Sequence, residues 1–319
     1  MRIGIPGTFF AAYHLPYWLS FFRALGMDCV VSGESSKKHA DFGGKTLPHE
    51  FCLPVKVFMG HILDLLAEEV DLIFVPRMTG KGNNHFFCPR FTGLPELVKY
   101  GLHVCDNMIL SPEVICNGID LRILTFPHLP GLTGRHFKAA GDAANKEWKD
   151  VLGRCRLQKL TLPEACQHEK ENKHNHAPRL NIGLLGYAYC LYDPFISKGI
   201  LAQLRKLDVH VCTWEMIEPQ MVTVYLHKPA KTIYWNFGRI MLGTGLYLLE
   251  NHNMDGLIYA STFGCGPDSI IAKILNLEAN NLRKPMLAII LDEHNSNNLL
   301  LTRLEAFVAM LAEQKEAVR

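Results

Sequence analysis

Asp255-Gly256-Leu257-Ile258-Tyr259-Ala260-Ser261-Thr262-Phe263-Gly264-Cys265-Gly266-Pro267-Asp268-Ser269 is the stretch that decides the fold. Its first half is an apolar run, which predicts a buried strand. Its second half predicts a tight turn into a helix, because Gly264 and Gly266 free the backbone and Pro267 suits a first helical turn. The Cys265 thiol therefore lies on a strand-to-helix turn, where helix N–H groups favour the thiolate. The alternative is a cysteine in a well-formed turn without a ligand.

The rest of the C-terminal half follows the same rhythm of strand and helix. Leu180-Asn181-Ile182-Gly183-Leu184-Leu185 predicts a strand, residues 194–207 a helix, residues 210–213 a second strand and residues 286–291 a closing strand. Strands that alternate with helices in this way favour a mostly parallel sheet covered on both faces.

The N-terminal half begins with a similar unit. Residues 2–5 predict a strand, residues 13–25 an aromatic-rich helix and residues 28–31 a second strand. The first turn, Gly4-Ile5-Pro6-Gly7, lacks the G-x-G-x-x-G spacing, and no acidic residue ends the second strand. A dinucleotide fingerprint is therefore excluded.

The chain is long enough for two α/β domains of the Rossmann or flavodoxin-like kind, since it has 319 residues. We expect an N-terminal domain over 1–166, a polar linker over 167–178 and a C-terminal domain over 179–319. The linker contains His168, His174 and His176. These histidines could bind a divalent metal, but a polar run without apolar periodicity favours a plain linker.

Composition narrows the function classes. A net charge of +2 gives no electrostatic case for binding nucleic acid or an anionic membrane. No apolar run is long enough to span a bilayer, and the first residues lack the layout of a secretory signal. We therefore expect a cytoplasmic protein whose ten cysteines stay reduced, which favours metal ligation or redox chemistry over disulfides.

Two further cysteines are placed like Cys265. After a polar run over 32–46, which predicts a loop, Cys52 stands where a loop meets a helix, and Cys88 stands in Phe87-Cys88-Pro89-Arg90 beyond a strand over 71–76. In open α/β sheets, ligands gather beyond the carboxyl ends of the strands, so such loop cysteines can converge.

The other cysteines lack glycine or proline neighbours of this kind. Cys190, Cys212, Cys29 and Cys105 have apolar or strand neighbours and are expected to be buried as small hydrophobic residues. Cys116, Cys155 and Cys166 are left unassigned.

These motifs together resemble a known superfamily, that of the 2-hydroxyacyl-CoA dehydratases and benzoyl-CoA reductases. More closely, they resemble its branch of acyl-CoA dehydratase activase-related proteins (DUF2229-like), over nearly the whole chain. The stretches that carry the resemblance are Glu50-Phe51-Cys52-Leu53-Pro54-Val55-Lys56, Cys88-Pro89-Arg90, Phe263-Gly264-Cys265-Gly266-Pro267-Asp268-Ser269, Asp292-Glu293-His294 and Thr302-Arg303-Leu304-Glu305-Ala306-Phe307.

The resemblance implies an iron–sulfur site between the two domains. In the better-known relatives, three cysteines hold a 4Fe-4S cluster with one iron open to substrate, and a separate ATP-hydrolysing iron–sulfur activase supplies a low-potential electron. Carried over by motif, the ligands here are Cys52, Cys88 and Cys265, with Gly264 and Gly266 beside the cluster. A larger, double-cubane cluster, a homologous partner subunit and an acyl-CoA substrate are further implications.

Two departures and two alternatives accompany the resemblance. The stretch Asn295-Ser296-Asn297-Asn298-Leu299-Leu300 replaces a small, glycine-containing one, so the role of that loop is in doubt. No phosphate-cradling loop is present, so ATP dependence must come from a partner. Three unrelated thiols are one alternative, and zinc is another, although no C-x-x-C pair completes a zinc site.

Two functional classes therefore stay open. The first is a catalytic component, a reductase or dehydratase that uses an activase-fed electron. The second is a non-catalytic electron carrier or cluster scaffold that docks an activase. Glu50, Lys56, His61 and His294 are candidate acid–base or substrate-orienting groups, and each could equally be a surface ion pair or a helix cap.

Overall fold

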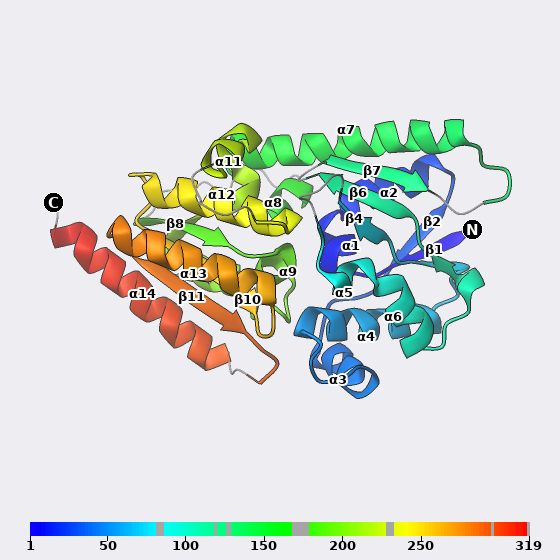
Figure 1. The fold of residues 1–319 in the computed structure, drawn as a ribbon, viewed down its shortest axis with the longest axis horizontal. Coiled ribbons are helices and arrows are strands. Elements are labelled where there is room, and N and C mark those ends of the chain that lie inside the picture. Colours follow the sequence, from blue (N-terminus) through cyan, green and yellow to red (C-terminus); the bar gives the residue numbers. More distant parts are fainter. Residues whose placement is uncertain are drawn as a thin grey trace. The chain divides into compact units, whose positions relative to one another are not determined.

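The computed structural model describes residues 1–80, 86–117, 120–125, 129–167, 179–227, 233–294 and 297–317 (Figure 1). The chain divides into two compact units. Unit 1 comprises Met1–Val151 with Ile233–Asn236, and unit 2 comprises Leu152–Thr232 with Phe237–Arg319. Among the described helices, none has the length and apolar character needed to cross a membrane.

Unit 1 contains a four-stranded parallel sheet with the order β2-β1-β3-β5. Its strands are β1 (Arg2–Ile5), β2 (Asp28–Val31), β3 (Leu72–Phe74) and β5 (Ile109–Leu110). β1 is nearly fully buried, as an inner strand of a parallel sheet covered on both faces should be. The predicted parallel α/β fold of this half is confirmed.

Helices connect and cover these strands in chain order. They are α1 (Phe9–Tyr13), α2 (Leu15–Ala24), α3 (Lys37–Thr46), α4 (Leu53–Ala67), α5 (Pro89–Thr92) and α6 (Leu94–Gly101), with a 3-10 turn over Asp106–Met108. The buried face of α2 carries Tyr17, Trp18, Phe21 and Phe22. Trp18 and Phe22 pack against Phe74 of β3, with ring centroids 4.6 and 5.1 Å apart.

The expected loop over 32–46 is wrong, because its second part forms α3. Ser36 and His39 form a capping box at the start of this helix, in which the Ser36 N–H donates to His39 Nδ1 at 2.9 Å. Buried Ala40 and Gly43 face the neighbouring helix α4. Tertiary packing of a small-residue face thus overrides a polar, glycine-containing composition.

A second, three-stranded sheet in unit 1 has the order β4-β6-β7. Its strands are β4 (Arg77–Thr79), β6 (Glu113–Asn117) and β7 (Asp120–Thr125), and β6 and β7 pair antiparallel. The long helix α7 (Gly134–Gln158) follows it. The hairpin of β6 and β7 was not anticipated from the sequence.

Unit 2 contains a four-stranded parallel sheet with the order β11-β10-β8-β9. Its strands are β8 (Leu180–Leu185), β9 (Val209–Cys212), β10 (Gly256–Thr262) and β11 (Met286–Leu291). Every residue of β10 is buried, which confirms the buried strand predicted there. β10 therefore forms the centre of the sheet that delivers Cys265.

The helices of unit 2 are short up to Tyr225 and longer from Asn236 onward. They are α8 (Leu162–Gln167), α9 (Ala188–Tyr192), α10 (Ile200–Lys206), a 3-10 turn over Trp214–Met216, α11 (Pro219–Tyr225), α12 (Asn236–Glu250), α13 (Gly266–Asn281) and α14 (Asn297–Ala317). α13 packs against β10 and β11 (Figure 1). The helix expected over 194–207 is shorter, because Asp193 binds the Phe195 and Ile196 N–H groups in a turn before α10.

Each parallel sheet has a point where the strand order reverses. In unit 1 it lies between β1 and β3, and in unit 2 between β8 and β10. Ligands of open α/β sheets bind at such points, beyond the carboxyl ends of the strands. This edge is therefore where a functional site is expected in either unit.

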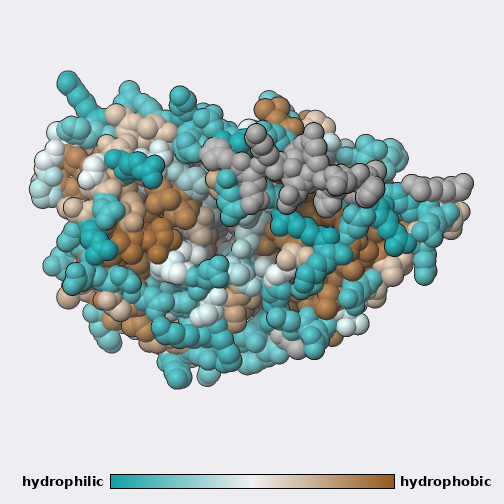
Figure 2. Space-filling view, turned by 180° about the vertical axis from the view of Figure 1, so that it is seen from behind, coloured by the Kyte–Doolittle hydropathy of each residue, from teal (hydrophilic) through white to brown (hydrophobic). Residues whose placement is uncertain are grey.

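The predicted domain boundary stays a prediction. Residues 168–178 of the expected linker, with His168, His174 and His176, lie outside the described residues. The division between the two units falls inside α7, after Val151. The face shown in Figure 2 is largely hydrophilic, with hydrophobic patches between the polar side chains.

Candidate functional site

Cys52, Cys88 and Cys265 share one local structure. Each is the residue that precedes the first turn of a helix, α4, α5 and α13 respectively. A proline stands at the first or second position of each of these helices. The placement of all three cysteines at loop-to-helix junctions is therefore as the sequence predicted.

Each cysteine also lies on the carboxyl side of its own parallel sheet. α4 leads into β3, and α5 and α6 lead into β5, so the starts of α4 and α5 lie beyond the carboxyl ends of the strands in unit 1. Cys265 follows β10 directly in unit 2. That the three thiols meet at one cluster between two domains stays a prediction.

Arg90 links the Cys52 loop to the Cys88 helix. Its guanidinium donates a hydrogen bond to the Glu50 carbonyl and lies 5.0 Å from the centre of the Phe51 ring. Burial raises the pKa of the Cys52 thiol, whereas Arg90 and the Val55 N–H oppose that rise. The Cys88 side chain adds to the rise, so the two thiols lie near each other. Arg90 therefore supplies a positive charge beside a thiol pair.

The start of α4 is fixed by close packing against α3. A Cβ on Gly43 would lie 2.1 Å from the Lys56 carbonyl oxygen, and one on Gly60 would lie 2.4 Å from the His39 Cα. Only glycine permits the two helices to approach this closely. Cys52 is thus presented by a rigid helix pair rather than by a free loop.

Aromatic side chains surround the Cys88 helix. Phe91 stacks against Phe9, whose ring centroid is 4.3 Å away. On the other side, the Phe86 N–H donates to the Tyr234 carbonyl at 2.8 Å, and the Asn236 N–H donates to the Phe86 carbonyl at 2.9 Å. Phe86 and Tyr234 are 52% and 53% exposed, so an aromatic surface lies two residues from Cys88.

The Cys265 turn has the predicted glycine geometry at one of its two positions. Gly264 has φ of +76°, which a side chain would strain. A Cβ on Gly266 would meet no atom within 4 Å, so open space lies beside that residue. The Cys265 N–H donates to the Thr262 carbonyl at 3.2 Å, which closes the turn at the end of β10.

Asp268 lies behind Cys265 and is fully buried. Its Oδ1 accepts a hydrogen bond from the Tyr259 hydroxyl at 2.9 Å, whereas its Oδ2 has no partner of good geometry among the described residues. Burial raises the pKa of Asp268 to about 7, and hydrogen bonds to Tyr259 and Cys265 oppose that rise. Cys265 therefore stands at one end of a buried polar chain.

The loop Asp292-Glu293-His294 follows the strand next to β10, since Thr262 of β10 pairs with Leu291 of β11. It thus lies on the same strand-end side as Cys265, as expected. Each of its three side chains offers one ligand atom, and these atoms lie within 4.8 Å of one another. The His294 side chain is 83% exposed. An exposed cluster of this kind does not by itself identify a metal site.

The other predicted site residues occupy different settings. Glu50 is exposed and contributes its backbone carbonyl to Arg90. Lys56 is buried in α4 and only 6% exposed. His61 lies nine residues beyond Cys52, which is roughly 13 Å along the helix axis.

His61 is held in the core of unit 1. Its ring nitrogens bind the Ser32 and Ser35 hydroxyls at 2.8 and 2.9 Å, and the ring stacks on His39 with centroids 4.2 Å apart. Burial, together with His39, lowers the pKa of His61 to about 4. This neutral, fully occupied imidazole has a packing role that the sequence did not distinguish from an acid–base role.

The remaining cysteines divide by burial. Cys190 and Cys212 are buried, as expected. Cys105 is exposed and Cys29 is half-buried, so the expectation of burial is wrong for them. Cys105 precedes a 3-10 turn after α6, and Cys29 lies on the edge strand β2. Cys155 is buried, Cys166 is half-buried, and the Cys116 side chain lies outside the described residues.

Sequence reasoning missed a buried carboxyl in unit 2. Glu215 is 1% exposed, and neither of its oxygens has a hydrogen-bond partner of good geometry in the described part of the chain. Burial raises its pKa to about 7, while the Thr213 and Tyr192 hydroxyls beside it oppose that rise. The sequence feature that could have revealed this carboxyl is the position of a glutamate inside the apolar run from Val211 to Ile217.

The chemistry of the donor set fits an iron–sulfur cluster. Thiolates are the soft ligands that such clusters require, and N–H groups at helix starts stabilise charge on their sulfurs. The three cysteines stand at helix starts with proline at the first or second helical position, and Cys52 has a cation beside it. Their chemistry is therefore compatible with that of cluster ligands.

Comparison with protein families identifies the family to which the chain belongs. The family model described as CoA enzyme activase uncharacterised domain (DUF2229) matches residues 2–217. No curated protein matches the chain at a significant level. Since the model covers more than half of the sequence, the chain belongs to this family of CoA enzyme activase domains.

Proposed function

We propose that this member of the CoA enzyme activase domain family is a cysteine-ligated iron–sulfur protein that handles electrons for a CoA-dependent enzyme. Cys52, Cys88 and Cys265 are its proposed ligands. In its more specific form, the proposal is that the chain is a protein of the 2-hydroxyacyl-CoA dehydratase type, which receives low-potential electrons from an ATP-dependent activase. It rests on the family membership and on the motif resemblance together.

The observation that carries the proposal is the pairing of Cys52 with Cys88. Two thiols from separate helix starts lie near each other with the Arg90 guanidinium beside them. Cys190, by contrast, is fully buried. The Arg90 cation favours the thiolate form of Cys52, and metal ligation requires the thiolate.

When bound, a 4Fe-4S or larger cluster supplies one-electron chemistry and, with three cysteine ligands, an iron open to another ligand. The chain's own residues prepare this site. Arg90 holds the two cysteine-bearing segments of unit 1 together and offsets their negative charge. Gly264 allows the turn that projects Cys265 from the end of β10.

A second candidate is a non-catalytic electron carrier or cluster scaffold that docks an activase. The exposed aromatic residues near two of the cysteines favour it. Phe86 and Tyr234 lie beside Cys88 in unit 1, and Phe263, which is 67% exposed, lies two residues before Cys265 in unit 2. Exposed aromatic side chains are enriched at protein–protein interfaces, so both loops suit contact with a partner protein.

Among the acid–base candidates, Lys56 and His294 remain proposals, and Glu50 remains one through its exposed side chain. His61 is a poor candidate, because both of its ring nitrogens are occupied by serine hydroxyls. An acyl-CoA thioester is the proposed substrate class. An ATP-hydrolysing iron–sulfur activase is the proposed electron donor, and a homologous subunit is a further proposed partner.

The test begins with anaerobic purification or reconstitution, followed by iron and sulfide quantification and EPR of the reduced protein. The wild type should hold iron and acid-labile sulfide, and Cys52→Ser, Cys88→Ser and Cys265→Ser should each lose them. Cys190→Ser is the control, because that thiol is fully buried within α9 and is not the residue before its first turn. Unchanged iron content in any of the first three variants removes that residue from the site.

The two candidate functions separate in a second assay. The purified protein is mixed anaerobically with the activase, ATP and a strong reductant, and oxidation of the reduced activase is followed as thioesters are added. Turnover supports a catalytic component, whereas reduction without turnover supports the carrier. Full activity with a mild donor and no ATP contradicts both candidates.

A further inference from the structure

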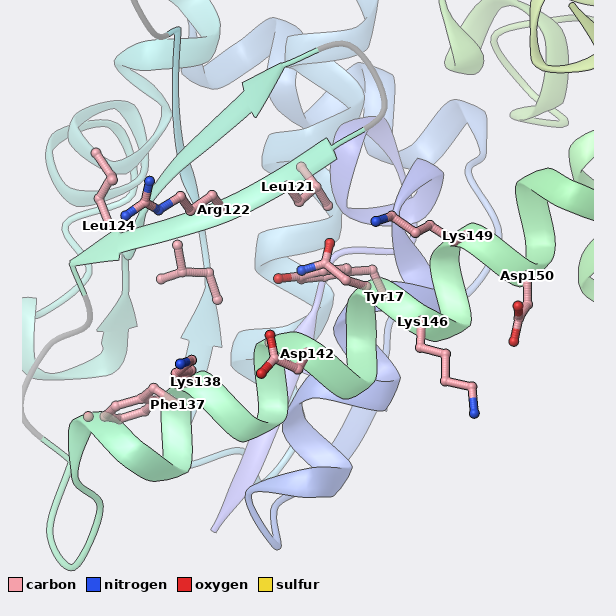
Figure 3. Close-up of a pocket in the computed structure, with 14 residues that line it drawn as sticks. Tyr17, Leu121, Arg122, Leu124, Phe137, Lys138, Asp142, Lys146, Lys149 and Asp150 are labelled. Atoms are coloured by element: carbon pink, nitrogen blue, oxygen red, sulfur yellow. The ribbon is translucent and has the colours of Figure 1, made fainter. Parts of the chain in front are cut away.

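A groove in unit 1 lies apart from the residues discussed so far. It has a volume of about 1180 Å³ and is bordered by β7 on one side and α7 on the other, with Tyr17 of α2 at its floor (Figure 3). Its lining residues on α7 recur every three or four positions from Gly134 to Asp150, so one face of the helix borders it. The adjacent face, with Ala140, Ala144 and Trp148, is buried.

The groove reaches the outer edge of β7. This strand is last in the order β4-β6-β7, and in the described residues its backbone pairs with β6 alone. Four consecutive residues, Leu121 to Leu124, line the groove. Because successive side chains of a strand point to opposite faces, four in a row border one space only where that space reaches the strand's edge.

The charges around this edge are mainly positive. Arg122 comes from β7, and Lys138 and Lys149 come from α7, with Lys149 extending from the helix toward the strand (Figure 3). Asp142 and Asp150 are the lining carboxylates, and Asp142 lies near enough to Tyr17 to add to the rise of that hydroxyl's pKa. In the described part of the chain, none of the three cations has an ion pair or hydrogen bond.

We propose that this groove binds an extended, acidic segment of a partner protein, which adds to β7 as a fourth strand. The exposed strand edge offers backbone N–H and C=O groups, which is the mode of recognition known as strand addition. Ile123, which points to the opposite face of β7 from Arg122, offers an apolar contact to alternate side chains of the segment. Arg122, Lys138 and Lys149 select glutamate or aspartate at the positions between.

This inference does not depend on the iron–sulfur proposal, because no cysteine lines the groove. A small anion such as a phosphate would use the cations but not the strand edge. The two occupants therefore differ in their need for backbone N–H groups, and the experiment uses that difference.

The probe is a dye-labelled peptide of about six alternating valine and glutamate residues, the usual length of a strand. Its binding to the full chain is followed by fluorescence anisotropy. The double variant Lys138→Glu with Lys149→Glu should weaken binding at least about tenfold, since it reverses two attractive charges. The matched control, Lys206→Glu with Lys273→Glu, makes the same charge change on exposed positions of unit 2 and should leave binding unchanged.

A second peptide carries the same charges but has proline in place of the central valine, which removes a ladder N–H. It should bind at least about tenfold more weakly than the first. Equal binding of the two peptides, or displacement of both by inorganic tripolyphosphate alone, overturns strand addition in favour of a simple anion site. No binding of the acidic peptide also overturns the proposal. Arg122→Glu repeats the charge test on β7 if the double variant fails to fold.

Discussion

The Tyr259 hydroxyl donates a hydrogen bond of 2.9 Å to Asp268 Oδ1, and both residues are fully buried. Tyr259 belongs to the central strand β10, and Asp268 belongs to the first turn of α13. The bond therefore fixes the start of that helix, and with it Cys265, to the middle of the sheet. It is a direct structural link between the core of unit 2 and its candidate ligand.

Tyr259→Phe should destabilise the protein, because Asp268 would then lose its hydrogen bond at Oδ1 while Oδ2 already lacks a partner of good geometry in the described residues. The expected loss is on the order of 1 to 3 kcal/mol in the free energy of unfolding. Urea unfolding followed by circular dichroism measures it. Tyr234→Phe is the control, since that side chain is 53% exposed, and an equal loss in both variants would remove the special role of the buried bond.

Glu215→Gln should stabilise the protein at pH 8 and have little effect at pH 5. Burial raises the pKa of Glu215 from 4.5 to about 7, so the native state binds a proton that the unfolded state releases between these values. Its favourable contribution is complete below pH 4.5 and is lost as the pH rises through 7. The amide removes that loss, which is on the order of 1 to 3 kcal/mol.

Thermal unfolding across this pH range checks the effect of Glu215. Glu313→Gln serves as the control, because that side chain is exposed on α14. A wild-type protein and a Glu215→Gln variant with parallel pH profiles would show that the carboxyl does not titrate as expected.

Gly43→Ala should be strongly destabilising and Gly44→Ala should not. The new Cβ at position 43 would lie 2.1 Å from the Lys56 carbonyl oxygen, which forces α3 and α4 apart at a cost on the order of 2 kcal/mol or more. The neighbouring Gly44 has open space around it, and alanine there should gain about 0.5 to 1 kcal/mol of helix propensity. Chemical denaturation of both variants gives the comparison, and equal effects would contradict the close helix contact.

Arg90→Gln should slow alkylation of Cys52. The arginine lowers the pKa of that thiol against the larger effect of burial, so its removal leaves less thiolate at a given pH. Iodoacetamide labelling at pH 8, quantified at Cys52 by mass spectrometry, measures the change in rate. Arg135→Gln, an exposed arginine near the start of α7, should leave the rate unchanged. Faster labelling in Arg90→Gln would mean that the arginine shields the thiol rather than activating it.

The sequence alone determined the parallel α/β class of both halves and the position of each candidate cysteine before a helix. These features are local: apolar runs with strand length, prolines at helix starts and glycines in turns act within a few residues. They predicted β10, the Cys265 turn and the start of α4. The same local signals failed for α3, whose helix depends on Gly43 packing against α4.

Only the tertiary structure decided which groups stand beside those cysteines. Arg90 reaches the Glu50 carbonyl across forty residues, and Tyr259 meets Asp268 because a strand and a helix pack together. It also showed that two serine hydroxyls enclose His61, which makes this histidine a poor acid–base candidate. It further showed that β7 is the last strand of its sheet and lies beside the lysines of α7. Burial and partners far along the chain set these properties, and no local pattern encodes them.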